Sequence, residues 1–199
     1  MGEASQRAHV YAKAKARLFS DVGAVADARV VAEVATALFE RFVLPRRYIG
    51  GCYLTTMFLH RYLLAERGIS TDPVLGYVND GTDDIMISHA WIEHNGRKVD
   101  VTLHLTDPRQ SLSGDLIVLD HLLRRGAATY SYHRDLTPAG LAAYQEMERA
   151  GGFPAQLLRH KQAEHRLMSE TMLDCDAMAR HQASAPPGLH YSDMRSALA

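Results

Sequence analysis

Cys52 is a candidate nucleophile, because it carries a thiol and follows a pair of glycines. A thiol becomes reactive when it is deprotonated, and the unpaired N–H groups and positive dipole end of a helix stabilise the thiolate. Cys52 follows Gly50-Gly51 at the predicted start of a helix, and Gly51 leaves room for a substrate backbone beside the sulfur. Most single cysteines are small buried hydrophobes, so a catalytic role also requires a base close to the sulfur.

His89 and Asp100 are the candidate base and its orienting carboxylate. Asn95-Gly96 predicts a two-residue hairpin turn in which His94 pairs with Arg97. With that register, His89 and Asp100 are diagonal neighbours on one face of a sheet, with roughly 7 Å between their Cβ atoms. A carboxylate in this position orients an imidazole and stabilises its protonated form. Each residue alone is usually structural, but the combination with a helix-start thiol is much rarer by chance.

These roles require a helix that begins at Cys52 and a sheet that brings His89 and Asp100 together. Apolar residues at intervals of three and four predict helices at 8–19, 25–43 and 52–67. Segments rich in β-branched and aromatic residues predict antiparallel strands at 73–78, 85–94 and 97–103. Beyond these, the sequence predicts a loop around Pro108, helices at 116–125, 138–149 and 154–181, a possible strand at 130–133, and a mobile tail from Pro186-Pro187.

The expected fold class is α+β, with N-terminal helices, the nucleophile helix packed on an antiparallel sheet, and C-terminal helices. The chain has 199 residues, of which 47% are hydrophobic, and this suffices for one sizeable core. We therefore expect a catalytic domain at residues 1–153, with its core at 48–105. A C-terminal helix and a mobile tail are expected to follow at 154–199.

The charge and hydropathy of the chain argue against several classes of protein. The formal net charge is -1 and no long block has one sign, so neither nucleic-acid binding nor membrane-surface binding has electrostatic support. No apolar run approaches the roughly 18 residues of a membrane span, and Met1 to Arg7 lack the core of a signal peptide. We expect a cytoplasmic protein, with export by a specialised secretion system left open.

Three motifs follow one another within residues 48–105. Gly51-Cys52 opens a helix, and His89-Ala90-Trp91-Ile92-Glu93 and then Asp100-Val101-Thr102 match HAW[VI]E and D-x-T patterns. In this order they resemble the transglutaminase-like superfamily of papain-fold cysteine enzymes. The resemblance implies a papain-like fold with Cys52 as nucleophile, His89 as general base and acid, and Asp100 as the residue that orients His89. Two positions depart from the family, with Lys98 in place of a common aromatic residue and Val101 in place of a frequent proline.

The reaction that these residues predict is acyl transfer. Cys52 would attack an amide or thioester carbonyl after His89 takes its proton, and water or an amine would resolve the thioester. The expected substrate is a peptide or protein, and the protease, deamidase and transglutaminase reactions all stay open, as does the oligomeric state. The backbone N–H of Cys52 and the side chain of Tyr48 are candidate oxyanion donors. Trp91 is expected to shield the His–Asp pair from water, although Tyr48 and Trp91 could equally be packing residues.

Two other functions fit the sequence. One is a non-catalytic protein-binding module on the same fold. The other is a helical interaction protein whose partner surface would be residues 25–43 and 154–181. Met168, Met172 and Met178 are expected to pack in the core or to dock on a partner.

The remaining metal-binding and thiol side chains are weak candidates. Cys175 lies between Asp174 and Asp176, whose charges disfavour a thiolate. His160 and His165, with these aspartates, lack the spacing of a metal site on one helix face. The two cysteines have no CxxC spacing and give no disulfide framework, so no metal and no cofactor is expected.

Overall fold

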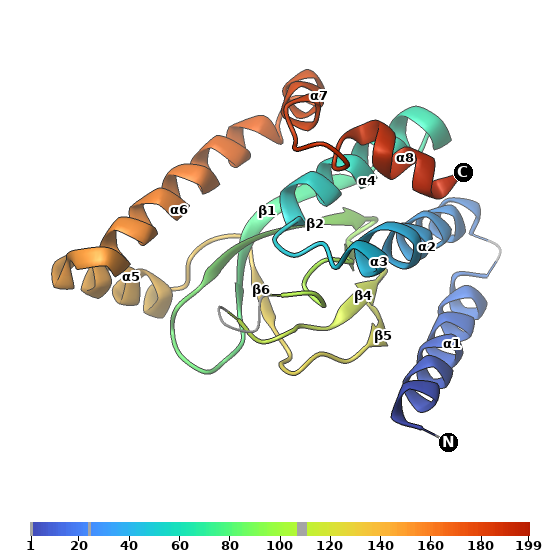
Figure 1. The fold of residues 1–199 in the computed structure, drawn as a ribbon, viewed down its shortest axis with the longest axis horizontal. Coiled ribbons are helices and arrows are strands. Elements are labelled where there is room, and N and C mark those ends of the chain that lie inside the picture. The colour runs from blue at the N-terminus through green and yellow to red at the C-terminus, as the bar shows by residue number, and fades with distance from the viewer. Residues whose placement is uncertain (1, 24, 107–110) are drawn as a thin grey trace.

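One curled antiparallel sheet of six strands forms the centre of the computed structural model, which describes residues 2–23, 25–106 and 111–199 (Figure 1). The strands lie in the order β5-β4-β3-β2-β1-β6. Together with the surrounding helices this confirms the predicted α+β class. The strands are β1 (Asp72–Asn79), β2 (Ile87–His94), β3 (Arg97–Asp100), β4 (Leu116–Val118), β5 (His121–Arg124) and β6 (Ser131–His133).

Helices precede and follow the sheet. The N-terminal ones are α1 (Glu3–Val22), α2 (Ala26–Leu38), the π-helical turn η1 (Phe39–Val43), α3 (Leu44–Arg46) and α4 (Cys52–Arg67). The C-terminal ones are α5 (Pro138–Ala150), α6 (Gly152–Thr171), α7 (Cys175–Ala183) and α8 (Tyr191–Leu198). In the part of the chain that the structure describes, none of these helices has both the length and the apolar character needed to cross a membrane.

Helix α4 has the bounds that the sequence predicts. It begins at Cys52, and it ends where Gly68 adopts a left-handed conformation with φ of 67° and bonds back to the last turn. The helix packs against β1 and β2 (Figure 1). Its side chains Phe58, Leu59 and Leu63 join Ile92 of β2 in the main core. Burial of this apolar face holds the start of α4 against the sheet.

The hairpin between β2 and β3 confirms the predicted register. His94 pairs with Arg97, and the ladder continues through the pair Ile92 and Val99. Asn95 and Gly96 have φ angles of 51° and 73°, as a type I′ turn requires. The tight turn therefore determines which residues of the two strands face each other.

Strand β3 is shorter than predicted and stops at Asp100 rather than at residue 103. The Asp100 carboxylate accepts hydrogen bonds from the backbone N–H groups of Thr102 and Leu103, at 3.0 and 3.2 Å. These bonds turn the chain back on the carboxylate, so the N–H groups no longer point to a neighbouring strand. The same side chain that was predicted to orient His89 thus ends the strand.

Residues 116–125 were predicted to be a helix, and this prediction is wrong. The segment forms β4 and β5, joined by a turn in which Leu119 and Asp120 have φ angles of 51° and 63°. The turn is tied to β3, because Asp120 N–H donates to the Lys98 carbonyl and Asp120 Oδ1 accepts from Lys98 N–H. A short apolar run has no distinctive period, and here pairing with β3 decided its structure.

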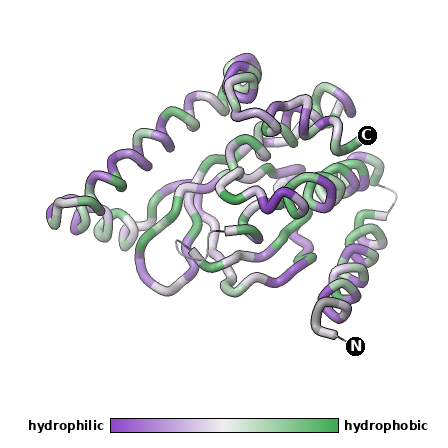
Figure 2. Tube along the Cα trace, viewed as in Figure 1, coloured by the Kyte–Doolittle hydropathy of each residue, from purple (hydrophilic) through white to green (hydrophobic). Residues whose placement is uncertain are grey.

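The C-terminal segment differs from its prediction at two points. The single helix expected at 154–181 is broken into α6 and α7, and Asp174 caps the start of α7 by accepting from Asp176 N–H at 2.8 Å. Where a mobile tail was expected, α8 packs on α2 and buries Met194 completely. Figure 2 shows α6 as alternating hydrophilic and hydrophobic positions, as expected of a helix with one packed face.

Four other predictions have different outcomes. The helix at 138–149 and the strand at 130–133 are found as α5 and β6, within a residue at each end. The loop around Pro108 lies outside the described residues. The division of the chain at residue 153 stays a prediction.

Candidate active site

Cys52 is the first residue of α4 and is half-buried. The residue before it, Gly51, lies directly under the ring of Tyr48, because a Cβ atom added to Gly51 would be 2.2 Å from Tyr48 Cε1. The Tyr48 ring also meets the ring of Phe42 edge to face, at a centroid distance of 6.0 Å. Glycine at position 51 thus lets an anchored aromatic ring lie against the peptide that leads into Cys52.

His89 lies between the candidate orienting carboxylate and the thiol. Its Nε2 is 2.6 Å from Asp100 Oδ2, which confirms the predicted contact. The nitrogen left for the thiol is therefore Nδ1. Burial alone would lower the pKa of His89, but the Asp100 charge and a side-chain hydrogen bond with Cys52 outweigh it and raise this pKa to about 10. The imidazole is therefore protonated at neutral pH and faces an anion on one side and a sulfur on the other.

Asp100 is completely buried and accepts several hydrogen bonds. Oδ2 accepts from His89 and from the Tyr132 hydroxyl at 2.8 Å. Oδ1 accepts from the Thr102 N–H and hydroxyl, at 3.0 and 3.2 Å, and from the Leu103 N–H at 3.2 Å. Burial alone would raise the pKa of Asp100, but the His89 charge and these donors lower it. The carboxylate is therefore ionised and fixed in position.

Tyr132 of β6 is a site residue that the sequence analysis missed. Its ring meets Trp91 edge to face at 5.2 Å, and the ammonium of Lys98 lies 3.5 Å from the ring centroid on its face. Burial and the charge of Asp100 raise the pKa of Tyr132, so the hydroxyl keeps its proton and donates a hydrogen bond to that carboxylate. The signal available was a tyrosine in a possible strand, but nothing local indicated that β6 pairs with β1 beside the site.

Trp91 lies beside the His89 ring. The two rings are nearly parallel, at 20°, with centroids 6.4 Å apart, and Trp91 is 3% exposed. Its Nε1 donates to Glu93 Oε1 at 3.0 Å. Gly76 of β1 makes room for the indole, because a Cβ atom there would lie 2.9 Å from Trp91 Cη2. The buried ion pair is thus covered by aromatic side chains, which strengthens its electrostatics by keeping water out.

Tyr48, the candidate oxyanion donor, lies close to Cys52. Burial, followed by the negative charge of Cys52, raises the pKa of Tyr48 to about 12. The hydroxyl therefore keeps its proton, and it has no hydrogen-bond partner among the described residues. Its role as a donor to the substrate stays a prediction.

The C-terminal helices supply one wall beside the thiol. Cys52, Tyr53 and Leu75 pack against a buried cluster that the sequence analysis did not connect with the site, and which we call the methionine cluster. Its members are Met57 of α4, Ala90 of β2, Met168 of α6, Met172 at the C-terminal cap of α6, and Met178 of α7. The predicted core role of the three C-terminal methionines is thereby confirmed, and their place in the core is next to Cys52.

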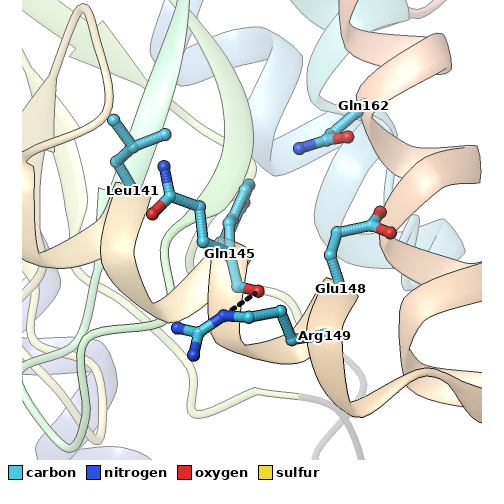
Figure 3. Close-up of a pocket in the computed structure, with 6 residues that line it drawn as sticks. Leu141, Gln145, Glu148, Arg149 and Gln162 are labelled. Atoms are coloured by element: carbon cyan, nitrogen blue, oxygen red, sulfur yellow. Dashed lines mark hydrogen bonds between the residues drawn. The ribbon is translucent and has the colours of Figure 1, made fainter.

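The other candidates lie apart from this arrangement. Cys175 is exposed, with its sulfur 3.8 Å from His60 Nε2. Within residues 2–23, 25–106 and 111–199, no group of three or more His, Cys, Asp or Glu side chains could hold a metal ion. A pocket of about 390 Å³ between α5 and α6 contains no residue of the triad (Figure 3). It is lined by Leu141, Tyr144, Gln145, Glu148, Arg149 and Gln162.

Gly51→Ala is expected to slow alkylation of Cys52 by iodoacetamide. The new Cβ would collide with the Tyr48 ring, and overpacking of this kind costs about 1–3 kcal/mol of stability. The rate constant is measured by mass spectrometry of the Cys52 peptide, and the free energy of unfolding by urea titration. In a Tyr48→Ala background the collision is absent, so the added alanine should then cost much less. Equal losses in both backgrounds would contradict the proposed contact.

The chain was compared with models of protein families, with curated proteins and with solved structures, and none of the three comparisons found a match. The function is therefore inferred from the geometry of the site alone.

Proposed function

We propose that this protein is a cysteine-dependent hydrolase or acyltransferase of papain-like, transglutaminase-like architecture that acts on a peptide or protein amide. The observation that carries the proposal is the buried His89–Asp100 ion pair, with Cys52 close enough to the imidazole to help raise the pKa of His89. A base held in one orientation and a nucleophile within its reach are what nucleophilic catalysis requires. The aromatic cover of this pair supports the same conclusion.

The proposed reaction proceeds through a thioester. The Cys52 sulfur, as the thiolate partner of the His89 imidazolium, attacks the carbonyl carbon and forms a C–S bond. His89 then donates its proton to the leaving nitrogen as the C–N bond breaks. Water or an amine attacks the thioester, His89 takes the proton of that nucleophile, and the C–S bond breaks to restore the ion pair. Asp100 stays ionised throughout.

The oxyanion of the tetrahedral intermediate needs donors near the sulfur. Cys52 is the first residue of α4, so its backbone N–H has no acceptor within the helix and is available. The Tyr48 hydroxyl is the proposed second donor. Both sit at the positive end of the helix dipole, where a developing negative charge is stabilised.

A non-catalytic protein-binding module is the alternative. Burying two charges costs several kcal/mol per ion before their attraction is counted, and a binding surface gains nothing from a buried pair. The Asp100 carboxylate also accepts four hydrogen bonds besides the one from His89. These bonds fix the carboxylate, and the carboxylate in turn fixes the His89 ring. This arrangement favours catalysis over binding alone.

Treatment with iodoacetamide at one equivalent and near neutral pH tests the proposal. We expect Cys52 to be alkylated well before Cys175, although Cys175 is the more exposed of the two. Peptide mapping by mass spectrometry gives the ratio. In denaturing urea the ratio should approach one, because the fold creates the difference. Equal and slow reaction of both thiols in the folded protein would favour the binding module.

A further inference from the structure

The chain neighbours of the proposed nucleophile and base are bonded to each other. Tyr53 follows Cys52 in α4, and Ser88 precedes His89 in β2. The Tyr53 hydroxyl lies 2.9 Å from Ser88 Oγ. The two elements that carry the reacting groups are thus joined one residue away from those groups.

A third residue, from the C-terminal part of the chain, is hydrogen-bonded to Ser88 as well. His165 of α6 places Nδ1 2.6 Å from Ser88 Oγ. Its ring stacks on the ring of Tyr77 in β1, with an angle of 16° and centroids 4.5 Å apart. Burial and the nearby charge of Arg166 lower the pKa of His165, so the neutral ring can accept a hydrogen bond. Ser88 then donates to His165 and accepts from Tyr53, and each hydroxyl proton has a partner.

The same face of α6 also makes apolar contact with the site. His165, Met168 and Met172 are spaced at i, i+3 and i+7, so they lie on one side of the helical path. Both methionines belong to the methionine cluster on which Cys52 packs. Helix α6 is thereby held beside Cys52 by the hydrogen bond of His165 to Ser88 and by the packing of the methionine cluster.

The triad itself does not fix the distance between sulfur and ring. Asp100 holds His89 within the sheet, whereas Cys52 belongs to a helix that packs against that sheet. Proton transfer requires the sulfur and the ring nitrogen to stay within hydrogen-bond reach, and a displacement of about 1 Å costs up to about 100-fold in rate. A polar tie between α4 and β2 beside the reacting groups is therefore where such control would act.

We propose that Tyr53, Ser88 and His165 form a positioning bridge that holds the Cys52 helix at proton-transfer distance from His89. The inference rests on the proposed function and extends it, because it makes α6 part of the machinery of the site. None of the three side chains is assigned a bond to the substrate. They act through the two residues that they hold.

Three variants remove the bridge one group at a time: Tyr53→Phe, Ser88→Ala and His165→Ala. The measurement is the rate constant for iodoacetamide alkylation of Cys52 in the full-length protein, as a function of pH, with thermal unfolding in parallel. Each variant is expected to lose roughly tenfold in rate at neutral pH. In each variant the pH profile for alkylation of Cys52 should shift toward the profile for Cys175, because the thiolate loses its fixed imidazolium partner. Ser88→Thr keeps the hydroxyl and should restore the wild-type profile.

Matched controls lie on the same helices. Tyr62→Phe removes a hydroxyl from α4 that bonds to Arg67 at the other end of the helix. His160→Ala removes an exposed ring from α6. Both are expected to keep the wild-type pH profile of Cys52. Tyr53→Phe removes a single oxygen atom, so it is the variant in which folding is least disturbed.

The outcomes separate the bridge from the proposed function. A folded Tyr53→Phe protein with the wild-type pH profile overturns the bridge, and so does an equal loss in the Tyr62→Phe and His160→Ala controls. If Cys52 of the unmodified protein reacts as slowly as Cys175, the proposed function fails, whatever the variants do. Loss of reactivity in all three variants, with rescue by Ser88→Thr, supports the bridge.

Discussion

Cys52→Ala is expected to abolish formation of an acyl-enzyme. With an activated ester such as p-nitrophenyl acetate, the unmodified protein should release a burst of p-nitrophenolate and gain one acetyl group. The alanine variant has no nucleophile facing His89, so turnover should fall on the order of 10⁴-fold or more. Absorbance gives the burst, and intact-protein mass spectrometry gives the acetyl group. Peptide mapping should locate the acetyl group on Cys52.

The control for this experiment is the second thiol of the chain. Cys175→Ala should keep the burst, because Cys175 is exposed and pairs with His60, away from the ion pair. Cys52→Ala should keep its fold, since it removes one sulfur from a half-buried position, and circular dichroism with thermal unfolding checks this. A folded Cys52→Ala protein that is acetylated at the wild-type rate would rule out Cys52 as the nucleophile.

The part of the site that was predictable from the sequence depends on short-range geometry. Asn95-Gly96 determines the register of its hairpin, and that register brings His89 to Asp100. Gly51 and Gly68 mark the two ends of α4, the helix that begins at Cys52. In each case the information lies within a few residues of the structure that it specifies, so a local pattern is sufficient.

What was missed depends on contacts between distant segments. Tyr132 bonds to Asp100 only because β6 adds to the free edge of β1, 32 residues further along the chain than the carboxylate. His165 reaches Ser88 across 77 residues. Residues 116–125 form strands because β3 offers them an edge. The local sequence pattern does not indicate any of these pairings, because tertiary contacts determine each of them.

The C-terminal helices cover one side of Cys52, and under the proposed function they would take part in substrate selection. One side of Cys52 is closed by the methionine cluster, and the Tyr48 ring lies on the Gly51 peptide that precedes it. Thioether side chains are flexible and adapt to different apolar surfaces. Under the proposed function, a substrate that reaches the sulfur would lie along these two walls, and residues outside the Cys52, His89 and Asp100 set would select the shape of that substrate.

Asp100→Asn is expected to lower acetylation of Cys52 on the order of 10⁴-fold, the usual size of this substitution in a catalytic triad. The amide can replace several hydrogen bonds but not the charge. Without the Asp100 charge, the contact with Cys52 is the main influence that still raises the pKa of His89. Burial then lowers this pKa, so the imidazole becomes neutral and no longer stabilises a thiolate at Cys52. The burst assay with p-nitrophenyl acetate measures this loss.

The same substitution should also change how stability depends on pH. The raised pKa of His89 contributes stability that is complete below its unfolded value of about 6.5 and is lost as pH rises toward about 10. The lowered pKa of Asp100 contributes stability that is complete above its unfolded value of about 3.9 and is lost as pH falls. Free energies of unfolding from urea titrations between about pH 5 and pH 10 should therefore decline with pH in the wild type and much less in Asp100→Asn. Tyr132→Phe keeps the charge and should keep the decline, whereas an identical pH dependence in the wild type and Asp100→Asn would mean that the two side chains do not form an ion pair.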